Sequence, residues 1–261
     1  MKKQIALGIL GLMSLSLASC GTHMSTYRDA DKYVAGNCTY ESEITTLDID
    51  WVSGDLILVE DITATEVKIE EKTNVSEEKG LVHTYLNDGV LKVKFAASGY
   101  WFNKPFIEKS LTITYRPGLD KINIDLTSGN LSANGLTAKK VGIDMTSGSA
   151  VVEAVIADDV DVDVTSGSIE LKSATAKNMF TDMTSGTVKV NYVSIEKSSF
   201  DLTSGKIKMT LPLDGGTVKV SKTSGSVYTN RECQIAGDTY KFGSGSANIK
   251  VSMTSGTLTI D

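Results

Sequence analysis

Histidine and proline are scarce in this sequence. The 261 residues include two histidines, His23 and His83, and three prolines, against 23 glycines. Histidine is the usual general base beside a reactive serine and a common ligand of transition metals. Its scarcity, together with the lack of any His/Cys/Glu cluster, argues against a serine hydrolase and against a transition-metal site. The low proline content and the 41% of hydrophobic residues indicate a folded chain rather than a disordered one.

Positive charge is also in deficit. Lys and Arg number 26 against 32 Asp and Glu, and removal of residues 1–19 would take away two lysines and no acid, leaving a net charge of about −8. Phosphate backbones repel a chain of this sign, so we expect no nucleic-acid partner. No run of about 18 apolar residues occurs after Cys20, so no transmembrane helix is expected there.

The first twenty residues, MKKQIALGILGLMSLSLASC, have the pattern of a secretion signal. Two lysines precede an apolar run, and small residues precede a cysteine. The ending Leu17-Ala18-Ser19-Cys20 resembles the lipobox of bacterial lipoproteins, which implies cleavage before Cys20 and acylation of that cysteine. We therefore expect a signal peptide over 1–19 and a protein held to a membrane by lipid on Cys20, facing outside the cytoplasm. The alternative is an ordinary signal peptide that happens to contain a cysteine.

The segment after Cys20 is polar and without periodicity up to about Asn37, so we interpret residues 20–37 as a lipidated tether. Two further cysteines, Cys38 and Cys233, would lie in an oxidising compartment. If the chain stacks in order from one end to the other, these two lie near opposite ends. They would then be much farther apart than the roughly 7 Å between Cα atoms that a disulfide tolerates, so we favour two free thiols.

A 19-residue repeat carries most of the information. The motif DxTSG begins at Asp125, Asp144, Asp163, Asp182 and Asp201. Before each Thr, apolar and polar residues alternate with period two, and beyond each Gly the apolar parity shifts by one, which indicates a corner made at a residue that tolerates positive φ. A third apolar pair precedes each Thr by ten and eight residues, such as Val193 with Ile195. Each unit therefore has three short stretches that face inward.

Such a unit cannot bury its own apolar face, but stacked copies can. We predict an all-β fold, a parallel β-solenoid with rungs of about 19 residues. One domain would cover 38–261, with irregular rungs over 38–118 and regular repeats over 119–261. An up-and-down β-sandwich is the alternative, but the constant spacing argues against it. Because the last strand ends at Asp261, we expect either an open edge there or an antiparallel closing hairpin.

The part before Leu119 keeps the pattern less strictly. DIDWVSGDLILVED matches the repeat with Val52 in place of Thr, and HTYLNDGVLKVKF predicts a hairpin around Asn87-Asp88-Gly89. We interpret this part as wider rungs of the same fold, the alternative being a separate domain. Four aromatic residues gather nearby, at Tyr100, Trp101, Phe102 and Phe106. They are candidates for partner contact, although such residues also cap cores.

These stretches resemble one known family. WVSGDLIL, the lead-in LTITYRPGLDKINIDLTSG and the iterated D-x-TSG units are similar to the DUF4097 family of β-strand-repeat proteins, from about residue 44 to the C-terminus. The resemblance implies a β-helix-like fold, a cell-envelope setting and an adhesin role. It supplies no catalytic or binding residues.

The repeated motif itself offers two kinds of chemistry. Its serines, Ser128, Ser147, Ser166, Ser185 and Ser204, lack a nucleophile elbow, and we expect them to line an inner corner. Its aspartates would form a column about 4.8 Å apart, in which like charges repel by roughly 0.8 kcal/mol in water. Either hydrogen bonds and screening offset this repulsion, or Ca²⁺ bridges Asp125, Asp144, Asp163, Asp182 and Asp201.

The sequence thus favours a lipid-anchored, non-enzymatic surface protein, an adhesin or interaction scaffold with no cofactor. Its partners would be the membrane, through lipid on Cys20, and an envelope or surface protein or glycan. One alternative is a structural or envelope-stress accessory protein without a ligand. Another is a Ca²⁺-dependent polysaccharide-binding protein or lyase. A lyase needs a base beside its cation, and Lys172, Lys189, Lys206 and Lys208 are scattered after the corner.

Overall fold

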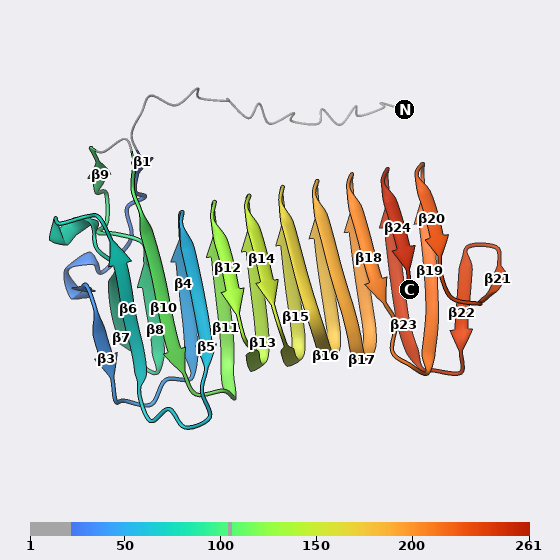
Figure 1. The fold of residues 1–261 in the computed structure, drawn as a ribbon, viewed down its shortest axis with the longest axis horizontal. Coiled ribbons are helices and arrows are strands. Elements are labelled where there is room, and N and C mark those ends of the chain that lie inside the picture. Colours follow the sequence, from blue (N-terminus) through green and yellow to red (C-terminus); the bar gives the residue numbers. More distant parts are fainter. Residues whose placement is uncertain (1–21, 104–105) are drawn as a thin grey trace, which may run out of the picture.

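The computed structural model describes residues 22–103 and 106–261. The predicted signal peptide and the lipidation site Cys20 lie outside this part. Figure 1 shows a row of rungs running side by side. The row begins at β3 (Cys38–Tyr40) and β6 (Val67–Thr73) and ends at β21 (Gln234–Ala236) and β22 (Thr239–Gly243). Across the described residues, no helix has the length and apolar character needed to span a membrane.

Each 19-residue unit forms one rung with three inward-facing stretches, as predicted. β16 (Ser168–Met183) passes through all three without a break, and β17 (Thr187–Leu202) does the same one rung further on. The buried residues of β16 are Ile169 and Leu171 in the first stretch, Ala174 and Ala176 in the second, and Met179, Thr181 and Met183 in the third. The prediction of an all-β, solenoid-like fold is confirmed.

The other rungs divide the same path between shorter strands. They are built from β4 (Thr46–Trp51), β5 (Asp55–Glu60), β11 (Leu119–Leu126), β12 (Asn130–Ala133), β13 (Leu136–Met145), β14 (Ser149–Val152), β15 (Val155–Val164), β18 (Lys206–Thr210), β19 (Gly215–Lys222), β20 (Ser226–Thr229), β23 (Ala247–Met253) and β24 (Thr257–Ile260). Strands of neighbouring rungs are parallel and pair equivalent positions, for example Asp125 with Asp144. The repeat period in the sequence is therefore the register of the sheet.

The TSG turn continues the backbone ladder around the corner. Thr127 N donates to Trp51 O at 3.1 Å and Ser128 N donates to Val52 O at 2.7 Å, and the same bonds recur from rung to rung. Turns in adjacent rungs therefore lie very close together. A Cβ on Gly129 would come within 2.3 Å of the carbonyl oxygen of Gly54, and Gly129 has φ +152. Only glycine fits this position, which explains why the motif is repeated so strictly.

At the C-terminal end the rungs do not stack in sequence order. β23 lies between β17 and β19, and β24 lies between β18 and β20, all in parallel pairs (Figure 1). The last strand is thus covered on both sides, which corrects the expectation that the chain ends on an uncovered strand. A closing hairpin exists, but β21 (Gln234–Ala236) and β22 (Thr239–Gly243) make it, and β22 is antiparallel to β19. Because all rungs carry the same ladder, the last one can fill a gap inside the stack and satisfy both of its edges.

The N-terminal end is also out of order. β8 (Val90–Lys94) and β10 (Lys109–Tyr115) stack outside β4 and β5 in parallel, although they follow them in the chain. Antiparallel strands then close this end, β6 (Val67–Thr73) on β10 and β7 (His83–Asn87) on β8. Outside these lie β3 (Cys38–Tyr40), paired with β6, and β2 (Val34–Ala35), paired with β7. The hairpin predicted at Asn87-Asp88-Gly89 is confirmed. One buried apolar cluster runs from Met24 to Ile260, so these irregular rungs belong to the same core.

Residues 22–37 do not form the free tether expected from their polar composition. β1 (Thr22–His23) pairs with β9 (Trp101–Phe102), and Met24 is buried. Tyr27 OH donates to Ala96 O at 3.1 Å. Two 3-10 turns complete this region, η1 (Ala30–Lys32) and η2 (Glu78–Gly80). A few apolar residues among many polar ones are enough to dock the segment, so its average composition was misleading.

A local register shift changes one predicted inward pair. β16 and β17 lose their regular pairing around Ala174, where Ala174 pairs with Tyr192. Tyr192 is therefore buried, whereas Val193, expected to face inward, is 61% exposed. At the two ends of the rod, Cys38 and Cys233 form no disulfide within the described part of the chain, in agreement with the expectation from stacking.

Candidate functional site

The aspartates of the repeat form a continuous column on one outer face. Parallel pairing places in line Asp50, Asp125, Asp144, Asp163, Asp182 and Asp201, followed by Ser252 and Ser221. At its N-terminal end Lys94 Nζ lies 3.2 Å from Asp50 Oδ2. Together with the neighbouring threonines, the C-terminal part of the column lines a shallow groove. Partial desolvation, reinforced by the neighbouring carboxylates, raises the pKa of Asp125 and of Asp163.

This column does not converge into a metal centre. Among residues 22–103 and 106–261, no three or more His, Cys, Asp or Glu side chains come together in a way that could hold a metal ion. The carboxylates of Asp125, Asp144, Asp163, Asp182 and Asp201 point outward in a row, one from each rung. Bridging of these five residues by Ca²⁺ stays a prediction to be tested.

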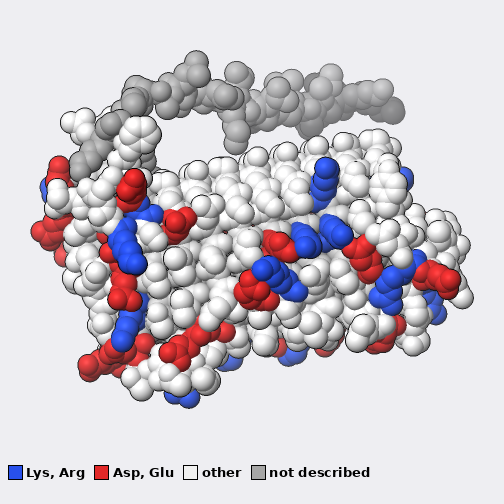
Figure 2. Space-filling model, in the orientation of Figure 1, with Lys and Arg blue, Asp and Glu red and all other residues white. Residues whose placement is uncertain are grey.

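A second column shows how the fold arranges charge elsewhere. Residues 120, 139, 158, 177 and 196, each 19 apart, alternate in sign as Asp, Lys, Asp, Lys and Glu. Lys139 Nζ lies 2.6 Å from Asp120 Oδ1, and Lys177 Nζ lies 2.7 Å from Asp158 Oδ1. On a further face Lys189 Nζ lies 2.6 Å from Glu170 Oε1. Of the four lysines expected to be scattered, Lys172, Lys189 and Lys208 pair with an acid one rung away. Figure 2 shows acids and bases interspersed on the visible face.

The serines of the motif lie outside the corner, which corrects the prediction that they line it. Ser128, Ser166, Ser185 and Ser204 are exposed, and Ser147 is half-buried. Ser147 Oγ donates to Thr127 O of the preceding rung at 3.1 Å. His83 is distant from this motif in the chain, and its Nδ1 lies 2.9 Å from Leu81 O. The turn serines therefore extend the hydrogen-bond ladder.

The aromatic segment divides between core and surface. Phe102 is buried, and its ring lies 5.6 Å from that of Phe95 and 4.8 Å from that of Tyr100. Phe102 therefore caps the core, so its assignment as a contact residue was wrong. Trp101 and Phe106 are 47% and 81% exposed. Tyr100 is half-buried, and its hydroxyl donates to Glu77 Oε2 at 2.7 Å. Only two of the four candidates thus present a large apolar surface to solvent.

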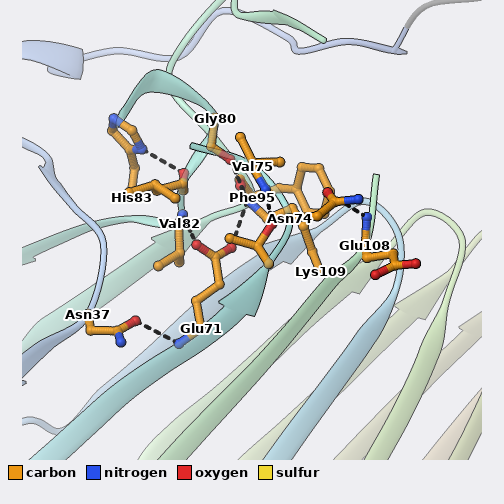
Figure 3. A network of polar contacts seen from close by, with 12 residues as sticks. Asn37, Glu71, Asn74, Val75, Gly80, Val82, His83, Phe95, Glu108 and Lys109 are labelled. Carbon is orange, nitrogen blue, oxygen red and sulfur yellow. Dashed lines mark hydrogen bonds and ion pairs between the residues drawn. The ribbon is translucent and has the colours of Figure 1, made fainter. Parts of the chain in front are cut away.

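A buried ion pair lies beneath this segment (Figure 3). Lys109 Nζ lies 2.7 Å from Glu71 Oε1 and donates to the carbonyl oxygens of Gly80 and Phe95, and both charged side chains are at most 2% exposed. The ammonium lies 4.4 Å from the centre of the Phe95 ring. Burial lowers the pKa of Lys109, but three acceptors and an aromatic face hold it as an ammonium. The pair links β6 to β10 and to the loops over them, so its role is structural.

One exposed aromatic residue on the regular rungs, Phe180, was not among the predicted site residues. Phe180 is 53% exposed on the same face as the aspartate column, two residues before Asp182. It lines a shallow pocket with Asn178, Lys197, Ser198, Ser199, Asn248 and Lys250. The available signal was the alternation of β16, where Phe180 takes an outward position and Thr181 the inward one.

These features define a stack of in-register β-rungs that is closed at both ends by antiparallel strands and carries its polar columns on the outer faces. The chain belongs to the DUF4097 family, described as Toastrack DUF4097, whose model matches residues 44–259. The family resemblance seen in the sequence is confirmed. A comparison with curated proteins gave no match.

Three solved structures illustrate what this chain is similar to. A putative adhesin of Bacteroides fragilis is 14% identical, with 86% of this chain and 96% of that chain covered and a TM-score of 0.46. A putative lipid binding protein of Parabacteroides distasonis is 13% identical, with coverage of 87% and 97% and a TM-score of 0.46. A putative adhesin of Parabacteroides merdae is 13% identical, with coverage of 92% and 100% and a TM-score of 0.44.

Proposed function

We propose that this protein is a non-enzymatic surface protein of the bacterial cell envelope, held by lipid on Cys20 and presenting the outer faces of its rod for interaction. The observation that carries the proposal is the short link between the anchor and the fold. Cys20 precedes the first strand, Thr22–His23, by two residues, and that strand is docked on β9 at one end of the rod. A lipid on Cys20 would hold the rod by that end and leave the faces of the regular rungs in solvent.

The exposed aromatic residues fit this arrangement. Trp101 belongs to the strand that pairs with β1, where the chain enters the fold from Cys20. Trp101 and Phe106 would thus lie nearest the lipid surface, where aromatic side chains are favourable. The aspartate column and the pocket at Phe180 lie on rungs farther along the rod. Partner contact through those faces is therefore compatible with anchoring.

Detergent-phase partitioning of the full chain tests the anchor. The wild type, expressed with its own signal in a bacterial host, is expected in the detergent phase, and Cys20→Ser in the aqueous phase. Because Cys20 precedes the first strand, Thr22–His23, the two proteins should unfold at the same temperature. A wild type found in the aqueous phase would refute the lipid anchor.

A pull-down from envelope extract tests the aromatic residues as a partner site. The variants are Trp101→Ala and Phe106→Ala, with Phe102 left intact because it belongs to the core. If the bilayer is the only contact of these residues, a non-acylated Cys20→Ser background captures the same proteins with and without the changes. Loss of a captured protein in that background would show a partner site instead.

A further inference from the structure

The pocket around Phe180 lies where the repeat departs most from its own pattern. The outward position of Phe180 is polar or glycine in the other rungs: Asp48, Asn123, Gly142, Asp161, Ser199, Lys250 and Lys219. The next position, which faces inward, holds Thr181, whereas Ile124, Ile143 and Val162 occupy it in preceding rungs. At this rung, therefore, the aromatic residue faces solvent and the hydroxyl faces the core.

Packing in the core explains why Thr181 occupies the inward position, but it does not explain why Phe180 occupies the outward one. Thr181 pairs with Phe200 of the next rung, so a small residue makes room for a large ring. Thr181 Oγ1 is buried and has no hydrogen-bond partner among the residues that the structure describes. Ser198 is small for a related reason, because its hydroxyl meets the buried Tyr192 OH at 2.8 Å. Nothing in the core requires an aromatic residue at 180. Departures from local consistency of this kind mark sites kept for function.

The pocket joins side chains from three neighbouring rungs. Asn178 pairs with Lys197 and Lys197 with Asn248, while Phe180 pairs with Ser199 and Ser199 with Lys250. The small Ser199 leaves a hollow beside the ring of Phe180, with an ammonium group and an amide on its borders. Asp182 and Asp201 of the aspartate column lie two residues further along the same strands.

The two lysines of this pocket differ from five lysines on the other faces that pair with acids. Lys139, Lys172, Lys177, Lys189 and Lys208 each have a carboxylate within 3.0 Å. Within the described part of the chain, Lys197 and Lys250 form no ion pair, and both are exposed. In a protein of net charge −6, two uncompensated ammonium groups beside an exposed ring are available to an anionic ligand.

We propose that this pocket binds an acidic saccharide, a sugar ring that carries a carboxylate. The exposed face of Phe180 offers a flat, electron-rich surface on which the C–H face of a sugar ring can stack. The side chain of Asn248 makes no hydrogen bond in the described part of the chain, and it can bond ring hydroxyls together with the side chain of Ser199. Lys197 and Lys250 would receive the carboxylate, and the aspartate column would repel it from the opposite border, so the ring has one preferred orientation.

This inference deepens the proposed function, because it names the ligand class of one exposed face. Binding to the full mature chain is measured by calorimetry at low salt, with oligogalacturonate, galacturonate monomer, a neutral oligosaccharide of equal length and poly-L-glutamate as probes. Oligogalacturonate is expected to bind, and the neutral sugar to bind at least several-fold more weakly. The monomer distinguishes a single-ring site from a polymer site.

Four variants test the assigned residues. Phe180→Ala should weaken oligogalacturonate binding roughly three- to tenfold. Lys197→Gln and Lys250→Gln should each weaken it roughly two- to fivefold and reduce its salt dependence. Phe180→Tyr should retain binding. Ile156→Ala is the matched control, because Ile156 is 51% exposed but lies on another face, so it should bind as wild type.

Three results would overturn the proposal. These are no oligogalacturonate binding at millimolar concentration, equal binding of the neutral sugar, or poly-L-glutamate binding that depends on the lysines but not on Phe180. The last result would assign the pocket to an acidic protein segment. Melting temperatures of the variants exclude misfolding. None of these results bears on detergent partitioning, so failure of the saccharide site and failure of the lipid anchor are distinguishable.

Discussion

Gly167 and Gly148 pack backbone against backbone at the turns of adjacent rungs. A Cβ on Gly167 would lie 2.6 Å from the carbonyl oxygen of Gly148, and Gly167 has φ +142. We predict that Gly167→Ala lowers the free energy of unfolding by about 2–4 kcal/mol, because backbone strain and overlap add. Gly237→Ala is the control, since Gly237 has φ +62 with no atom within 4 Å, and it should lose about 1–2 kcal/mol. Urea unfolding measures both, and equal losses would contradict the packing argument.

Removal of one charge from the aspartate column should stabilise the protein. The folded-state pKa of Asp163 is raised, so its contribution to stability is full below the unfolded pKa and is lost as the pH rises through the folded pKa. At pH 7 the ionised carboxylate therefore costs stability. Asp163→Asn is expected to gain about 0.3–0.8 kcal/mol at pH 7 and low salt, and the gain should vanish near pH 3 and shrink with added salt.

Asp158→Asn is the matched change in the column of alternating sign. Asp158 Oδ1 lies 2.7 Å from Lys177 Nζ at the surface, so this variant should lose about 0.5 kcal/mol or less at pH 7. Urea unfolding of Asp158→Asn and Asp163→Asn at pH 7 and at pH 3 compares the two variants. A gain in both variants would show that net charge, rather than the column, sets the effect.

Calcium should act on this protein only by screening. The described residues contain no group of carboxylates that could hold a metal ion, so CaCl2 and NaCl at equal ionic strength are expected to give the same melting temperature. A calcium-specific increase at millimolar concentration would restore the cation-bridged column. In that case Asp163→Asn should reduce the increase.

The buried pair of Lys109 and Glu71 should be sensitive to loss of one partner. Glu71→Gln leaves an ammonium with no counter-charge in an apolar site, and we expect a loss of about 3–5 kcal/mol in urea unfolding. Glu170→Gln removes the partner of the more exposed Lys189 and should cost less than about 1 kcal/mol. The double variant Glu71→Leu with Lys109→Met should recover much of the loss. A mild effect of Glu71→Gln would mean that water reaches this site.

The C-terminal strand should be among the protected parts of the chain. Leu258 and Ile260 of β24 are fully buried between two parallel neighbours, although the chain ends at the next residue. Hydrogen exchange of their amides is expected to be as slow as in β17, whereas those of β21, whose residues are all exposed, should exchange fast. Fast exchange at Ile260 would show that this rung opens from the end.

Local features of the fold could be predicted from the sequence, but the order of the end rungs could not. The period, the inward positions and the glycine corners follow from alternation around each TSG turn. Any rung can pair with any other, however, because all present the same ladder and a similar apolar face. The pairing of β17 with β23 rather than β19 therefore has no local pattern that predicts it.

The candidate site, too, could be predicted from the sequence only in part. The aspartate column follows directly from the repeat, and Phe102 and Trp101 alternate between core and surface as neighbours in a strand do. Phe180 was overlooked because the prediction compared equivalent positions of the repeats and selected residues that recur, and Phe180 does not recur. Its place in an otherwise polar column was visible only after the register of all rungs was known.

Both ends of the rod are built from segments that the chain lays down before returning toward the middle. A copy of one 19-residue unit inserted among β13 to β17 would leave both closing layers unchanged and lengthen the rod by about 4.8 Å. The rod can therefore become longer in evolution by internal duplication. The closing strands at both ends would still keep other molecules from pairing with the sheet. With the proposed lipid anchor on Cys20, the distance from the membrane to the last rung would change in steps of one repeat.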